Sequence, residues 1–385
     1  MQKSKFMDAW SVSKSDFPHD GSAQEKLAFC VRYAILAPSP FNTQPWFFEI
    51  KGDTLTVYAD RRYCLPVSDP DDRGLIIAAS AALYNLRLAI RNFGYEEITE
   101  YLPNTERESI LARVKIGKKS EVSVTPESHK RFEALTSFEF DHSAFSDKAV
   151  SQEDVQALKD AVVQERAWLY ICDRDCKPEI MNMIAEADQT QTMNKNFRRE
   201  FASWTDWRRK LGGDGLPQYA KSFSKSMNTF TPSEVRRFKG GEGDVATDDE
   251  FTNGVPLLAI LGSVTGGMVE RILTGQALMR LCLTAASRGL SVSTLNQVCE
   301  IPELRLRLHD EINQQGRAHV ILRIGHSNGK PELNIRRPLS SVLIVDDQPY
   351  HDDMFASEGG KKQKMSSKRS FFNKFSKVFL AKKAS

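Results

Sequence analysis

Three polar side chains stand close together in APSPFNTQPWFFEI, residues 37–50: Ser39, Asn42 and Gln44. Asn and Gln each carry a donor and an acceptor on one planar group. This suits a ligand edge that alternates donors and acceptors, such as the pyrimidine edge of a flavin or a nucleobase. Three prolines restrict the stretch, so the amides would be pre-positioned. From composition alone, the favoured interpretation is a polar loop whose amides bond backbone groups.

A second candidate for chemistry is the pair Arg336 and Arg337, which follows a predicted strand at 319–324. Paired guanidinium groups can bind a dianionic phosphate in a bidentate manner. Taken without other information, the pair is better interpreted as a solvated surface feature. No pattern in the sequence requires a catalytic acid, base or nucleophile, and we nominate none.

Other motifs are weak. The seven histidines show no HExxH spacing, and CDRDC, residues 172–176, has no second cysteine pair or nearby histidine, so we expect no metal site. The glycine cluster at 240–243 neither follows a strand nor opens a helix. We therefore expect a dinucleotide to bind transiently, as a substrate.

The candidate residues need elements to hold them. Apolar spacing predicts a helix over 24–36, and strands at 46–50 and 55–58 flank a hairpin turn. In SDPDDRG, Asp69 can cap a helix and Pro70 suits its first position; the helix would run from about Leu75 to Phe93, and Gly94 would end it. Later segments predict strands at 110–116, 254–264 and 319–324 and a helix that starts at Pro302.

One segment repeats. ALYNLRLAIRNFG at 82–94 and ALMRLCLTAASRG at 277–289 share Ala, three Leu and a final Gly in register, at an offset of 195 positions. This favours a duplicated unit. The alternative is two unrelated amphipathic helices with similar leucine spacing.

Composition limits the class of protein. The chain has 385 residues, 41% hydrophobic and 27% charged, which is ordinary for a globular protein with a core. From Gly359 onward there are nine basic and no acidic residues. The remainder holds 44 basic and 50 acidic residues, a net charge of about −6, which does not favour nucleic-acid binding. The start lacks a secretory h-region, no apolar run reaches bilayer length, and six scattered cysteines indicate reduced thiols, so we expect a cytoplasmic protein.

The end of the chain is predicted to be a separate module. Residues 346–367 have the composition of a linker, and 368–385 place five apolar side chains on one face of a basic helix. Such a helix would dock on an anionic membrane or a partner groove. The alternative is a disordered solubilising tail.

Several segments in order resemble the FMN-dependent nitroreductase superfamily. They are APSPFNTQPW, LPVSDPDDRGLIIAASAALYNLRLA, GQALMRLCLTAASRGL, HVILRIGHS and RRPL, spread over residues 22–345. The chain is most similar to the Acg-type FMN-binding oxidoreductases, in which two nitroreductase-like halves are fused. The resemblance implies an α+β fold with antiparallel-rich mixed sheets flanked by helices, and two tandem halves that form an intrachain pseudo-dimer. A monomer would then suffice.

The resemblance, which covers residues 22–345, implies two halves and a cofactor site, and composition adds the loop, the linker and the tail. The divisions are an arm (1–21), a first half (22–125), a second half (126–345) with a mobile loop (221–253), a linker (346–367) and the tail (368–385). In the superfamily the site lies between two subunits. The implied cofactor-binding residues are Ser39, Asn42 and Gln44 beside the flavin, and Arg323, Arg336 and Arg337 at the phosphate.

The sequence departs from the family pattern in FEFDHSAFSDKAV, residues 138–150, where arginines that clamp the phosphate would be expected. His142 can donate to a phosphate, more strongly when protonated. Glu139 and Asp141 would oppose an anion there. In REFASWTDWRRK, Trp204 and Trp207 resemble a helix that covers the site.

These observations leave three functions open. The first is an FMN-binding oxidoreductase that passes electrons from NAD(P)H to a small organic acceptor, such as a nitroaromatic compound or a quinone. The second is a flavin-binding or flavin-storing protein with little turnover. The third is a cofactor-free pseudoenzyme whose duplicated scaffold serves interaction.

Overall fold

A computed structural model describes residues 5–121, 123–143, 145–216, 257–327, 329, 331–352 and 354. The predicted loop at 221–253, most of the linker at 346–367 and the tail at 368–385 lie outside the described residues. The chain divides into two units, Met1–Tyr350 and His351–Ser385, and the description below concerns the first.

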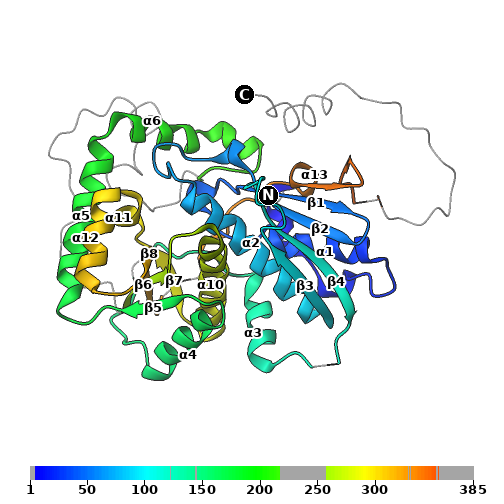
Figure 1. Cartoon of the computed structure of the whole chain (residues 1–385), viewed down its shortest axis with the longest axis horizontal. Helices are drawn as coiled ribbons and strands as arrows, with labels where there is room; N and C mark the ends of the chain where they lie inside the picture. Colours follow the sequence, from blue (N-terminus) through cyan, green and yellow to red (C-terminus); the bar gives the residue numbers. More distant parts are fainter. Residues whose placement is uncertain are drawn as a thin grey trace. The chain divides into compact units, whose positions relative to one another are not determined.

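The first unit contains helices and two separate sheets (Figure 1). The helices are α1 (Ala23–Ala34), α2 (Arg73–Asn92), α3 (Pro126–Leu135), α4 (Gln152–Val163), α5 (Cys176–Met193), α6 (Lys195–Trp204), α10 (Met268–Ser287), α11 (Gln297–Glu300), α12 (Pro302–Ile312) and α13 (Leu339–Val342). Short 3₁₀ helices are η1 (Lys5–Ser11), η2 (Lys14–Asp16), η3 (Pro40–Asn42), η4 (Arg61–Tyr63) and η5 (Trp207–Leu211). The strands are β1 (Trp46–Lys51), β2 (Thr54–Ala59), β3 (Tyr95–Tyr101), β4 (Ile110–Lys119), β5 (Trp168–Ile171), β6 (Leu257–Ser263), β7 (Ser291–Thr294), β8 (Arg317–Gly325), β9 (Leu343–Val345) and β10 (Gln348–Pro349).

The two sheets contain the same strand order. One runs β10-β9-β1-β2-β4-β3 and the other β5-β6-β8-β7, so the first, second, fourth and third strands of each half are neighbours in both. Strand pairs are antiparallel except β1 with β9, which is parallel. The predicted α+β class with antiparallel-rich mixed sheets is confirmed. The parallel partner of β1 comes from the end of the segment 126–345.

The repeated segments are two central helices that pack against each other, between the two sheets in Figure 1. Helix α2 spans 73–92 and α10 spans 268–287, so both have 20 residues and both ends differ by the same 195 positions. Gly94 and Gly289 follow them with left-handed φ of 84° and 74°, where glycine ends a helix without strain. The predicted correspondence therefore extends to the helix boundaries.

The two helices touch closely at Gly275. A Cβ there would lie 2.2 Å from the Ile77 carbonyl oxygen and 2.6 Å from the Ser80 Cβ. Ser80 and Gly275 are themselves 195 positions apart, so equivalent positions meet at this contact. A residue without a side chain permits the approach of the two backbones.

Helix α2 is apolar on nearly all sides. It is the one described helix long and apolar enough to cross a membrane by composition, with a mean hydropathy of 1.3. Most of it is buried against α1, α3, α10 and the first sheet. A helix enclosed on every face needs no polar stripe, so its composition reflects the core of this unit.

The start of α2 differs from the prediction. Pro70 does not open the helix, which begins at Arg73 after Asp72 takes a left-handed φ of 52°. The reason is a turn over 69–72, closed by a hydrogen bond from the Asp72 amide to the Asp69 carbonyl. Asp69 still caps, because its carboxylate accepts from the amides of Gly74 and Leu75, each at 2.9 Å.

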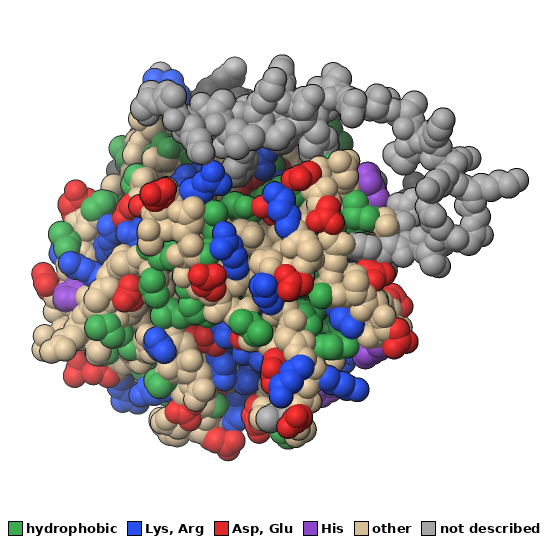
Figure 2. Space-filling model, turned by 45° about the vertical axis from the view of Figure 1, so that its right-hand side comes forward, with side chains coloured by type: hydrophobic (Ala, Val, Ile, Leu, Met, Phe, Trp, Pro, Cys, Tyr) green, Lys and Arg blue, Asp and Glu red, His purple; other side chains and the backbone are tan. Residues whose placement is uncertain are grey.

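The second half carries insertions that the first lacks. Helices α5 and α6 and η5 follow β5, and α11 and α12 separate β7 from β8. Helices α5, α11 and α12 cover one face of the second sheet through a buried apolar cluster that includes Ile180, Ile184, Leu304, Leu308 and Ile321. Of the two tryptophans singled out near α6, Trp204 is buried and Trp207 is 59% exposed. Figure 2 shows basic and acidic side chains interspersed over one face of the molecule.

Candidate cofactor site: the loop before β1 and the segment 334–337

The loop that leads into β1 has an unusual backbone. Phe41, Asn42 and Gln44 all adopt left-handed φ angles of 50–51°. Non-glycine residues in such conformations each cost about 1–3 kcal/mol, and they persist where the surroundings fix them, often at ligand sites. The fixing contacts are visible here, because Ser39 Oγ accepts from the Gln44 amide at 2.8 Å and Phe41 packs on Phe201.

Asn42 is buried and bonded to two other segments. Its Nδ2 donates to the Gly215 carbonyl at 3.1 Å and to the Ile335 carbonyl at 3.0 Å. Its Oδ1 accepts from Arg336 at 3.4 Å. The Asn42 amide thus joins the loop before β1 to the segments 213–215 and 334–337. Its polar groups bond protein groups, as the interpretation of a polar loop whose amides bond the backbone predicts.

Gln44 and Arg337 form a second buried contact. Gln44 Nε2 donates to the Gly213 carbonyl at 2.7 Å, and its Oε1 accepts from the Arg337 amide at 2.8 Å. The Arg337 guanidinium donates to the carbonyls of Gln44 and Ser341, each at 3.1 Å, and stacks 4.0 Å from the Tyr63 ring centroid. Burial lowers the pKa of Arg337. No described carboxylate forms an ion pair with it, although it is only 3% exposed.

Arg336 turns to the other side of the same extended segment. Its Nη2 lies 2.9 Å from Glu139 Oε2 and 3.0 Å from the Leu36 carbonyl, and its guanidinium lies 4.7 Å from the Trp10 ring centroid. Its Nε is buried without a partner. Successive residues of an extended chain project to opposite sides. The structure therefore does not bring the guanidinium groups of Arg336 and Arg337 to one point.

Arg323 projects from β8 toward the segment 141–145. Its Nη2 donates to the carbonyls of Ser143, at 2.9 Å, and Asp141, at 3.2 Å, and its guanidinium lies 4.1 Å from the Phe145 ring centroid. Its Nε is also buried without a partner. Like Arg337, Arg323 has no ion pair with a carboxylate in the described part of the chain.

His142 lies beside Arg323. Its Nδ1 is 3.2 Å from Ser293 Oγ on β7. Desolvation by surrounding protein atoms lowers the pKa of His142 to about 4, against the opposing charge of Glu139, although its side chain is exposed to solvent. The ring is therefore neutral near pH 7, and it would meet a phosphate as an uncharged donor.

These contacts form two groups, one of the loop at 39–44 with Arg336 and Arg337, and one of Arg323 with the segment that carries His142. The loop at 39–44 touches Arg336 and Arg337, Arg336 pairs with Glu139, and residues 141–143 touch Arg323. The sequence did not predict Glu139 as the ion-pair partner of Arg336. It also did not predict the contacts of Trp10 with Arg336, Tyr63 with Arg337 and Ser293 with His142. The only signal for Glu139 was its position where arginine is expected. Trp10 and Tyr63 gave no signal, since each reaches its arginine only through the fold.

The chemistry of this donor set fits an anionic ligand with a polar edge. Arg337 and Arg323 are buried or half-buried cations without an ion-paired carboxylate, although Asp60 and Asp214 act on Arg337 and Asp141 acts on Arg323 without forming an ion pair. Arg323 and Arg336 each retain a buried Nε without a partner. Arg336 is the exception among these arginines, because Glu139 already forms an ion pair with it.

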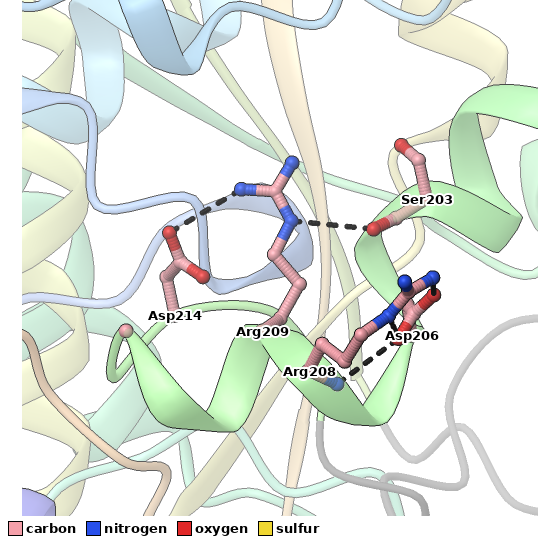
Figure 3. A pocket seen from close by; sticks show the side chains of 6 residues that line it. Ser203, Asp206, Arg208, Arg209 and Asp214 are labelled. Atoms are coloured by element: carbon pink, nitrogen blue, oxygen red, sulfur yellow. Dashed lines mark hydrogen bonds and ion pairs between the residues drawn. The ribbon is translucent and has the colours of Figure 1, made fainter.

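A hollow of about 490 Å³ lies next to the loop (Figure 3). It is lined by Ser203, Asp206, Arg208, Arg209, Gly212 and Asp214. Gly212 and Asp214 face this hollow, while the carbonyls of Gly213 and Gly215 accept from Gln44 and Asn42. In Figure 3, Arg209 extends toward Asp214 and Ser203, and Arg208 toward Asp206. One short segment therefore separates the candidate site from the hollow.

No group of three or more side chains suited to a metal ion occurs in the part of the chain that the structure describes. Cys172 follows β5 and Cys176 opens α5, and burial is the first cause of the raised pKa of Cys172.

Relatives with similar sequences cover most of the chain. A Mycobacterium tuberculosis protein named "Putative NAD(P)H nitroreductase" is 24% identical over 345 residues, covering 86% of this chain and 94% of its own. "Putative NAD(P)H nitroreductase acg" from the same organism is 22% identical over 322 residues, 82% and 94% of the two chains. An uncharacterized protein from that organism is 22% identical over 333 residues, 84% and 94%.

No family model matches the chain. A crystal structure of a nitroreductase with bound FMN from Bacteroides fragilis aligns with 56% of this chain and 98% of its own, at 13% identity and a TM-score of 0.33, which is too low to support an inference. The resemblance to the nitroreductase superfamily is confirmed by the sequence relatives, which match more than four fifths of this chain.

Proposed function

We propose that this chain is a flavin-dependent oxidoreductase that binds FMN between two tandem halves and passes electrons from NAD(P)H to a small organic acceptor. The observation that carries the proposal is the gathering of Ser39, Asn42 and Gln44 with Arg336 and Arg337 in one region. The names of the relatives agree with this function.

We also propose that the two halves form an intrachain pseudo-dimer. The shared strand order, the matching bounds of α2 and α10, and the contact between Ser80 and Gly275 support it. A site assembled from both halves then needs no second chain.

Each group has a distinct part in holding the cofactor. Arg337, which has no ion pair with a carboxylate among the described residues and lies against the loop at 39–44, would balance the negative charge of the phosphate. Asn42 and Gln44, whose amides bond protein groups, would fix the shape of the loop beside the ring edge, and packing holds its strained backbone. When bound, the flavin would supply hydride and electron transfer. The chain's own residues would position the cofactor, balance the charge of its phosphate and limit access of water to it. None is assigned to proton transfer.

The visible absorption spectrum of the purified protein tests this proposal. Flavin bands that bleach on anaerobic addition of NADPH or NADH support the oxidoreductase. Bands that persist favour the alternative of a flavin-binding protein with little turnover, which agrees with the commitment of Asn42 and Gln44 to protein groups. A colourless protein that takes up no FMN contradicts both.

Replacing Arg337 with Met separates binding from folding. The change removes donors to the carbonyls of Gln44 and Ser341 and the electrostatic interaction with Asp60 and Asp214, so we expect a moderate fall in the unfolding temperature. FMN affinity, measured by quenching of flavin fluorescence, should fall by about tenfold or more. Arg307→Met is the matched control, since Arg307 is exposed and pairs with Glu179 and Glu186 on the surface. A large loss of stability without loss of FMN affinity would assign Arg337 to structure alone.

A further inference from the structure

The turn at residues 213–215 occupies one N–H group on each of the two amides in the loop before β1. The Gly213 carbonyl accepts from Gln44 Nε2 at 2.7 Å, and the Gly215 carbonyl accepts from Asn42 Nδ2 at 3.1 Å. The Gly215 amide donates to the Asn42 carbonyl at 3.3 Å. The two carbonyls of the turn therefore stand where a ligand edge with two acceptors would bind these amides.

The other polar groups of the two amides are held by a different segment. Asn42 also bonds the Ile335 carbonyl and the Arg336 guanidinium. The Oε1 atom of Gln44 accepts from the Arg337 amide at 2.8 Å. Loss of the turn would thus free one donor on each amide, while the segment 335–337 would keep both amides in their present orientation.

The hollow of about 490 Å³ lies on the other side of the turn. Gly212 and Asp214 line it, whereas the two neighbouring carbonyls bond the loop before β1. In Figure 3, the Asp214 carboxylate extends toward Arg209, and the two groups lie 3.4 Å apart. The turn therefore has open space on the side away from the amides.

Glycine makes the conformation of this turn adjustable. Gly213 and Gly215 have left-handed φ angles of 78° and 80°. A Cβ at Gly215 would lie 2.6 Å from the Trp204 carbonyl oxygen, so the present conformation depends on glycine there. Because glycine adopts left- and right-handed conformations with similar ease, the turn can take other conformations at little cost.

We propose that the turn at 213–215 is a gate, which occupies the amides of Asn42 and Gln44 and moves toward the hollow when a ligand edge with two hydrogen-bond acceptors takes its place. This inference rests on the proposed function, in which that edge is the pyrimidine end of the flavin ring. The apparent affinity for the ring is then the intrinsic affinity multiplied by the fraction of chains whose gate is open.

The experiment compares Gly215→Ala with Gly212→Ala. Alanine at position 215 is strained by the left-handed φ and by the nearby Trp204 carbonyl, so it disfavours the closed gate. Gly212 provides the matched control beside the gate, because its φ is −96° and a Cβ there would lie 3.5 Å from the Arg209 carbonyl oxygen, an ordinary contact.

Flavin fluorescence quenching measures the affinities of these proteins. We expect Gly215→Ala to bind riboflavin and FMN about tenfold more tightly than the wild type, and Gly212→Ala to stay within about twofold. Both flavins should respond by the same factor, because the amides would meet the ring and not the phosphate. A Gly215→Ala protein that binds both flavins no more tightly than the wild type overturns the gate.

Hydrogen exchange followed by mass spectrometry tests the gate without flavin. The peptide that contains Gly215 should exchange through a local opening that low urea does not accelerate, and about tenfold faster in Gly215→Ala than in the wild type or Gly212→Ala. Exchange that requires global unfolding in all three proteins overturns the inference. If no variant binds flavin, the proposed function fails, and the exchange rates still decide whether the turn opens.

A second pair of variants decides the question if the alanine protein does not fold. Asp214→Asn weakens the ion pair between the gate and Arg209, and Asp206→Asn makes the same change at the pair with Arg208, on the same hollow. Riboflavin is the probe, because it lacks a phosphate that the charge of Asp214 could influence through Arg337. We expect about threefold tighter binding to Asp214→Asn alone. Equal affinities of the two variants overturn the gate.

Discussion

The loop that enters β1 spans residues 35–45, whereas the loop that enters β5 spans only 164–167, although each joins a helix to the first strand of a four-strand set. The longer loop holds three non-glycine residues in left-handed conformation and bonds Arg336 and Arg337. In the shorter one, Glu165 pairs with Arg280.

The elements that pack together are alike in the two halves, whereas the loops that could form a site differ. The two halves agree in strand order and in α2 and α10, where each half buries apolar surface against the other. They differ in the segments that carry the candidate residues. The amides of Asn42 and Gln44 come from the segment before β1 and bond Arg336 and Arg337 from near the end of the segment 126–345, whereas the loop before β5 forms no equivalent contact with them.

We expect the largest effect from a side chain added where α2 and α10 are in contact. Gly275→Ser places a Cβ 2.2 Å from the Ile77 carbonyl oxygen, and we expect a loss of about 3 kcal/mol in the free energy of unfolding, measured with urea. The double variant Ser80→Gly/Gly275→Ser exchanges the two equivalent residues and should recover about half of the loss, because the clash with the Ser80 Cβ is gone.

Gly329→Ser is the control for the helix contact, since nothing lies within 4 Å of a Cβ at Gly329, and it should change stability by less than about 0.5 kcal/mol. A Gly275→Ser protein as stable as the wild type would show that the α2–α10 contact is looser than described.

A second prediction concerns α11, which has no counterpart in the first half. Burial raises the pKa of Glu300 to about 8, above the usual 4.5, and its Oε2 accepts from Gln191 at 2.7 Å. Between these two values the folded chain holds a proton that the unfolded chain has released. The stabilising contribution of protonated Glu300 is thus complete below pH 4.5 and is lost as the pH rises through about 8.

Glu300→Gln cannot ionise and keeps an acceptor for Gln191. Its stability relative to the wild type should therefore increase with pH, by up to about 1.4 kcal/mol per pH unit between pH 5 and 8. Urea unfolding of both proteins at four pH values measures this difference. Parallel curves would mean that Glu300 titrates normally and that the inserted layer is open to water.

The smallest expected effect tests whether α2 and α10 end in the same way, at Gly94 and Gly289. Gly94→Ala and Gly289→Ala each force alanine into a left-handed conformation with open space around the Cβ, and each should cost about 1 kcal/mol. The double variant should show the sum, because the sites do not share partners. Clearly unequal single losses, measured by urea unfolding, would show that the two helices end in different ways.

Local patterns predicted much of this fold. The helices and strands around residues 24–36, 46–58 and 319–324 follow from apolar periodicity, and the repeat predicted two matching helices. The predicted helix ran from about Leu75, with Pro70 suited to its first turn, whereas α2 begins at Arg73 after a turn that Asp69 caps from outside the helix. Such a cap depends on a turn that composition does not specify.

The site was predicted less completely than the elements around it. The resemblance indicated Ser39, Asn42, Gln44, Arg336 and Arg337, which the structure places in contact, and also Arg323 and His142, which it places in a separate group. The resemblance did not indicate the directions in which the side chains of Arg336 and Arg337 point, which depend on the extended backbone of these two residues. The partner of Arg336 lies 197 positions away in sequence, so no local pattern could identify Glu139 in that role.

The parallel pairing of β9 with β1 has a consequence for synthesis of the chain. When β1 leaves the ribosome, one of its edges has no partner until residues 343–345 emerge, about 290 residues later. Throughout that interval an unpaired strand edge is open to other nascent chains. Translation speed and early chaperone contact therefore bear on the yield of this protein, and the first half produced as a separate fragment would keep that edge exposed.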